Sequence, residues 1–119
     1  MNIALWVCQG VLAAVCLLSG SLKSTMSLQG MVATGQTGVQ GFPLPAIRVV
    51  AACELAAAVG LILPWATDIA PVLTPLAALG FGVVMIGAAA NHSRLREPGP
   101  VVVNVALLAA SVFVASGRL

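Results

Sequence analysis

Glu54 is the side chain of this sequence best suited to proton chemistry, because it is an ionisable group inside a long apolar stretch. It follows Ile47 by seven residues, which places it roughly 10 Å along a helix from the start of that stretch. In lipid, a bare carboxylate at this depth costs on the order of a few kcal/mol. It must therefore be paired, protonated or hydrated. Two roles remain open: a group that handles protons or orients a ligand, and a structural ion pair that locks neighbouring helices.

Four further polar residues complete the set of candidates. His92 is a second acid–base candidate, since an imidazole exchanges protons near neutral pH, although an interfacial anchor is the simpler interpretation of its polar neighbourhood. Lys23, Arg48 and Asn104 are candidate ligand-binding residues, because they and His92 fall at or within about a turn of the same membrane interface if the segments alternate in direction. Arg48 precedes Glu54 by six residues, a net rotation of about 240°. Partners for Glu54 must therefore come from neighbouring segments or from backbone carbonyls.

The composition requires these residues to act in or against a membrane. The chain has 119 residues, of which 61% are hydrophobic and 7% are charged, so the charged side chains are too few to cover a water-soluble body. Five lysines and arginines in total are too sparse for a nucleic-acid footprint. The sequence carries no haem, iron–sulfur, flavin or metal motif, so any electron chemistry would belong to a partner or to a bound cofactor.

Four apolar segments are each about as long as a membrane-spanning helix. They cover residues 3–22, 47–65, 72–90 and 101–117. A lipid-exposed backbone must be helical or part of a closed barrel, and these segments lack the alternation of a barrel. The sequence therefore predicts an all-α membrane protein: a four-transmembrane-helix bundle in a single domain over residues 1–119.

The one long connection, residues 24–46, has two interpretations. Leu28, Met31 and Val32 have the spacing of one helical face, which favours a short helix lying in the interface between the first two spans. The high glycine density at Gly35, Gly38 and Gly41 favours an irregular loop instead.

Charge and aromatic placement predict an orientation. If the spans alternate in direction, most of the basic side chains share one end of the bundle: Lys23, Arg48, Arg94 and Arg96. The positive-inside rule places that end in the cytoplasm and both termini outside. Trp6 and Trp65 then fall at the outer interface, as an aromatic belt requires. We expect the cytoplasmic membrane of a bacterium as the location.

Small residues at i, i+4 spacing predict how the helices associate, since close backbone approach drives packing in lipid. The spacing occurs at Gly10 and Ala14, at Ala52, Ala56 and Gly60, and at Ala78 and Gly82. Packing within the bundle is favoured over a dimer seam.

Taken in order, these features resemble the DoxX-like family of small four-helix membrane proteins. The first is LSGSLK at 18–23, which closes the first segment with a lysine. The second is Arg48 followed by ACEL at 52–55 and GLILP at 60–64. The third is APVLTPLAA at 70–78, followed by GAAANH at 87–92, and later in the sequence by Asn104 and Gly117-Arg118. The resemblance covers essentially the whole chain.

The resemblance implies function at the level of the family. Members take their name from a subunit associated with terminal quinol oxidase and thiosulfate:quinone oxidoreductase activity, and others resemble membrane partners of redox or thiol-handling enzymes or receptor-assembly chaperones. The resemblance implies that a polar cluster forms from Lys23, Arg48, Glu54 and His92. It also suggests a quinone as cofactor and a soluble or membrane redox subunit as partner, and it is compatible with an oligomer.

Three functions follow as hypotheses. The first is a membrane subunit of a redox complex that binds a quinone-like or other lipophilic molecule, with Glu54 and His92 handling protons near its head group. The second is a non-catalytic assembly or scaffold protein, in which Arg48 and Glu54 only fix the bundle. The third is a small membrane isomerase that uses Glu54 as acid and base. A proton-coupled multidrug exporter is disfavoured, because those exporters carry a glutamate in their first helix and the first segment here has no ionisable group.

Overall fold

The protein is a bundle of four long helices with one short helix at its side. The computed structural model describes residues 2–33 and 40–119, and within them no strand occurs. The helices are α1 (Asn2–Thr25), α2 (Leu28–Ala33), α3 (Leu44–Thr67), α4 (Leu73–Arg94) and α5 (Pro98–Arg118). Among these, α1, α3, α4 and α5 are long and apolar enough to cross a membrane. The predicted all-α fold with four spans is confirmed.

The helices extend beyond the predicted apolar segments, mostly at the polar ends. Helix α1 continues past Lys23 to Thr25, α4 continues through His92 to Arg94, and α5 begins at Pro98 in the loop that was expected to precede it. Proline suits the first turn of a helix, where its missing N–H would have no partner in any case. In the long connection, the helical interpretation is confirmed for 28–33, whereas Gly35 and Gly38 lie outside the described residues.

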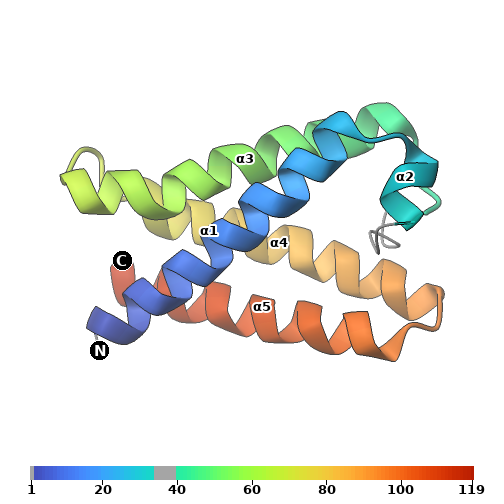
Figure 1. Ribbon diagram of the computed structural model, residues 1–119. Helices are drawn as coiled ribbons and strands as arrows, with labels where there is room; N and C mark the ends of the chain where they lie inside the picture. The colour runs from blue at the N-terminus through green and yellow to red at the C-terminus, as the bar shows by residue number, and fades with distance from the viewer. Residues whose placement is uncertain (1, 34–39) are drawn as a thin grey trace.

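The four long helices alternate in direction around the bundle. Helix α1 packs against α3 and α5, and α4 packs against the same two helices from the other side. Figure 1 shows both termini at one end of the bundle and α2 at the other. The molecule is 40 Å along its longest axis, which matches a bilayer with its head-group regions.

The core lies at the centre of the bundle, and a second small core holds α2. The central residues are Leu12, Cys16, Leu61, Ala78, Phe81, Met85, Val114 and Ala115. Met31 of α2 is fully buried against Ile47 of α3, which ties the short helix to the first turn of α3. Large apolar side chains also cover the outside of all four spans, as lipid contact requires.

The packing prediction for small residues is right for some positions and wrong for others. Ala78 and Gly82 are buried, and a Cβ on Gly60 would meet Ala77 of α4 at 3.0 Å. In contrast, Gly10, Ala14, Ala52 and Ala56 are exposed on the outer surface. The i, i+4 spacing identifies a smooth helical face but not the direction in which that face points, because packing decides the rotation of each helix.

Pro64 lies inside α3 and its effect is compensated by α4. A proline at this position cannot donate to the carbonyl four residues earlier, which belongs to Gly60. The Thr74 hydroxyl donates to that carbonyl oxygen at 2.8 Å, and Thr74 is fully buried. A side chain of α4 thus replaces the missing hydrogen bond of α3 and joins the two helices.

Candidate functional site

An ion pair between Lys23 and Glu54 joins α1 to α3. The Lys23 ammonium donates to Glu54 Oε1 at 2.6 Å, and the side chains are 13% and 1% exposed. Arg48 donates to the backbone carbonyl oxygen of Lys23, one of the carbonyls that the last turn of a helix leaves without an intrahelical partner. The expectation that Glu54 pairs outside its own helix is therefore confirmed, and Arg48 serves the end of α1 instead.

Gly20 makes this ion pair geometrically accessible. A Cβ at this position would lie 2.9 Å from the Leu55 side chain and 3.1 Å from the Ala51 carbonyl oxygen. Only glycine therefore allows α1 and α3 to approach this closely. Lys23 follows one turn later, which places its ammonium within reach of Glu54.

A cavity of about 440 Å³ lies in the half of the bundle that contains this ion pair. Its apolar wall comes from all four long helices and the turn before α3: Val15, Leu18, Phe42, Ala46, Ile47, Val50, Val84, Met85, Gly87, Ala88, Val103 and Leu107. Its polar residues are Ser19, Lys23, His92 and Asn104. We call this space the lateral cavity.

The lateral cavity opens between α1 and α5. These helices meet near the termini, where a Cβ on Gly117 would clash with Leu5, and they diverge toward the other end of the bundle (Figure 1). Leu18 on α1 and Val103 on α5 line the cavity and are 65% and 57% exposed. Both belong to the apolar outer surface of the bundle, so side chains that face outward border the cavity on this side.

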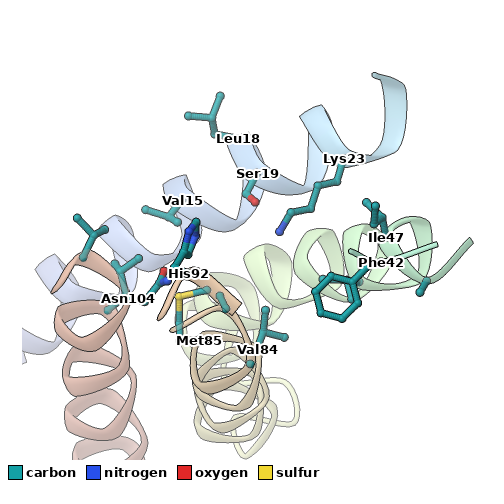
Figure 2. A pocket seen from close by; sticks show the side chains of 16 residues that line it. Val15, Leu18, Ser19, Lys23, Phe42, Ile47, Val84, Met85, His92 and Asn104 are labelled. Carbon is teal, nitrogen blue, oxygen red and sulfur yellow. The ribbon is translucent and has the colours of Figure 1, made fainter. Parts of the chain in front are cut away.

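The polar residues of the lateral cavity lie on opposite walls (Figure 2). Ser19 and Lys23 project from α1, whereas His92 and Asn104 come from α4 and α5. Asn104 is 8% exposed, and its Nδ2 has no hydrogen-bond partner within residues 2–33 and 40–119. The space can therefore hold an amphipathic molecule, with an apolar body against the aliphatic wall and a polar head group among these side chains.

His92 is paired with a residue that the sequence did not single out. Its Nδ1 lies 2.8 Å from Glu97 Oε1. Glu97 is in the turn between α4 and α5, where its backbone N–H donates to the His92 carbonyl oxygen at 3.0 Å. The available signal was the five-residue spacing of a histidine and a glutamate around the polar turn that ends directly before Pro98.

The five candidate residues form one neighbourhood but not one cavity wall. Lys23, His92 and Asn104 line the lateral cavity. Glu54 pairs with Lys23, which lines the lateral cavity. Glu54 itself lies on the wall of a separate cavity of about 510 Å³ between α3 and α4. Its Oε2 has no hydrogen-bond partner in the part of the chain that the structure describes. Arg48 is absent from the described lining of both cavities.

A second polar cluster, which the sequence analysis missed, lies at the end with the termini. Arg118 is 6% exposed, and it donates to Gln9 Oε1 and to Asn2 Oδ1, both at 2.8 Å. Its guanidinium lies 4.6 Å from the ring centre of Trp65 and 5.4 Å from that of Trp6. The spacing of Asn2, Trp6 and Gln9 along one helical face was the signal that could have indicated this cluster.

The comparison with protein families agrees with this architecture. The model of the DoxX-like family matches residues 7–114, which include α3 and α4 completely and most of α1 and α5. The chain is an integral membrane protein, and it belongs to the DoxX-like family. No curated protein and no solved structure matches the chain.

Proposed function

We propose that this protein binds a quinone-like or other lipophilic small molecule with a polar head group in the lateral cavity. The observation that carries the proposal is the cavity itself, which is apolar over most of its wall and polar at Ser19, Lys23, His92 and Asn104. The Lys23 ammonium has three N–H groups, of which Glu54 accepts one, so it can also donate to a carbonyl oxygen of the head group. Nδ2 of Asn104, which has no hydrogen-bond partner among the described residues, adds a second donor.

In this proposal the protein is the membrane subunit of a redox complex. The described residues include no group of three or more histidine, cysteine, aspartate or glutamate side chains that could hold a metal, and the bound molecule and a partner subunit would supply the electron chemistry. The basic residues at the cavity end favour a cytoplasmic position for the head-group site and an outer position for both termini. A bacterial cytoplasmic membrane suits this arrangement.

A cavity-filling variant tests the proposal. A Cβ on Gly87 would meet no atom within 4 Å, and Gly87 lines the lateral cavity. Gly87→Leu therefore adds a side chain at the wall of the cavity, starting from an open Cβ position. Gly10 is equally open but lies in neither described cavity, so Gly10→Leu is the matched control.

The measurement is the binding of decylubiquinone to the purified protein in lipid nanodiscs, followed by native mass spectrometry and by thermal stability. We expect binding to the original chain and to Gly10→Leu, and at least tenfold weaker binding to Gly87→Leu. Equal binding by all three proteins, or no binding to any, would refute the lateral cavity as a quinone site.

The ion pair favours a second candidate, a non-catalytic scaffold. Glu54 is 1% exposed and already neutralised by Lys23, as expected of a residue that only fixes the bundle. The two candidates predict different effects of Gly87→Leu on the cellular phenotype that depends on this protein. The phenotype is unchanged if the protein is a scaffold, and it is lost if the protein is a ligand-binding subunit. The isomerase alternative would require a substrate at Glu54, on the wall of the separate cavity between α3 and α4.

A further inference from the structure

The two ring nitrogens of His92 have different partners. Nδ1 faces Glu97 Oε1 at 2.8 Å, and the Glu97 side chain is 27% exposed at the end of the bundle. An ionised carboxylate can only accept hydrogen bonds. The hydrogen of this contact therefore belongs to Nδ1, which donates to Glu97.

The position of this hydrogen determines what His92 offers to the lateral cavity. A neutral imidazole carries one N–H, so a hydrogen on Nδ1 leaves Nε2 with a lone pair. His92 lines the cavity, and in this tautomer the remaining ring nitrogen is a hydrogen-bond acceptor. Lys23, on the opposite wall, can only donate.

The turn between α4 and α5 holds Glu97 in place. Its N–H donates to the His92 carbonyl oxygen at 3.0 Å, and the N–H of Arg96 donates to the Ser93 carbonyl oxygen at 3.1 Å. Arg96 adopts a left-handed conformation with φ of 58°. The carboxylate is thus positioned by the backbone of a tight turn, and the tautomer of His92 is fixed locally.

We propose that the lateral cavity selects a lipophile that presents a hydroxyl group to Nε2 of His92, which is the hydroquinone form of a quinone-like molecule, and that Glu97 is the positioning residue for this selection. This inference rests on the proposed function of the cavity. A hydroquinone donates its O–H to Nε2 and accepts from Lys23 through an oxygen. The oxygens of a quinone can only accept hydrogen bonds, so a quinone leaves Nε2 of His92 without a donor.

The first test reads the tautomer directly. His92 is the one histidine of the chain, so ¹⁵N NMR of histidine-labelled protein in lipid nanodiscs at pH 8 reports on this ring alone. We expect the hydrogen on Nδ1 in the original chain, and a mixture of both tautomers in Glu97→Gln, because an amide can either accept or donate. Asp68→Asn, an exposed carboxylate at the other end of the bundle, is the control and keeps the original spectrum. A hydrogen on Nε2 in the original chain would overturn the proposal.

The second test compares ligands. Decylubiquinol, decylubiquinone and the dimethyl ether of decylubiquinol are titrated anaerobically into the same nanodiscs. We expect the hydroquinone to bind roughly fivefold more tightly than the other two, the factor that one net hydrogen bond carries. In Glu97→Gln this ratio falls toward one, while Asp68→Asn retains it.

The outcomes separate the two proposals. Equal binding of hydroquinone and quinone that Gly87→Leu abolishes would refute the hydroxyl preference and leave the quinone-like site intact. Tighter binding of the quinone would refute the preference in the same way. Failure of all three probes to bind would refute both proposals.

Discussion

Glu54 illustrates at the residue scale how a buried carboxylate depends on a partner from another helix. The sequence showed that Arg48 could not be assumed to be that partner, because six residues rotate the two side chains to different faces. It could not single out Lys23, because the rotation of α1 against α3 depends on the close approach at Gly20. That Glu54 needs a partner follows from its own charge and depth. Which residue is the partner depends on how α1 and α3 pack against each other.

We predict that Glu54→Gln lowers the free energy of unfolding by about 3 kcal/mol, because the largely buried ammonium of Lys23 loses its counter-ion. The measurement is unfolding of the purified protein in mixed micelles. The double variant Lys23→Met, Glu54→Leu should lose less unfolding free energy than the two single variants lose together, because it leaves no uncompensated charge. If the losses of the two single variants add up to the loss of the double variant, the interaction between Lys23 and Glu54 does not stabilise the protein.

At the element scale, the hydrogen bond between α3 and α4 shows how a proline is accommodated inside a spanning helix. Pro64 removes the donor for the Gly60 carbonyl, and Thr74 supplies another. Both residues were visible in the sequence, but their juxtaposition required the antiparallel packing of the two helices. The apolar lengths, by contrast, were sufficient to predict all four spans, since each must match the thickness of a bilayer.

Thr74→Val should cost about 1–2 kcal/mol of stability, because it leaves the Gly60 carbonyl without a donor while keeping the shape of the side chain. Thr67→Val is the matched control: the Thr67 hydroxyl donates at 2.6 Å to Leu63 of its own helix, in an exposed position. We expect a much smaller change there. Thermal unfolding followed by circular dichroism measures both variants, and equal losses would contradict the assigned role of Thr74.

The whole molecule is closed at one end and open at the other. Arg118 holds the end of α5 against α1 through Gln9 and Asn2, and Gln9 in turn donates to the Leu61 carbonyl oxygen of α3 at 2.6 Å. At the opposite end α1 and α5 diverge around the lateral cavity. Polar contacts therefore tie α1, α3 and α5 together at the closed end, whereas the cavity lies at the open end.

Arg118→Met tests this division. It removes the hydrogen bonds to Gln9 and Asn2 and the ring contacts, so we expect a loss of about 2 kcal/mol in stability. The chain has two tryptophans, and both contact this guanidinium, so the tryptophan emission should change as well. Decylubiquinone affinity should remain within about twofold, since the cavity lies at the other end. A large loss of affinity would show that the two ends are coupled.

The sequence by itself determined the class of the protein, the four spans, the family resemblance and the small set of polar residues that need partners. These properties follow from composition and from the length of apolar runs, which lipid constrains directly. The tertiary structure decided that Lys23 pairs with Glu54, that His92 pairs with Glu97, that Arg118 is buried, and that Gly10 and Ala52 face outward. The contact of His92 with Glu97 depends on the backbone of the turn between α4 and α5. The other three depend on how one helix is rotated against another, and that rotation is set by the close contacts of many side chains together.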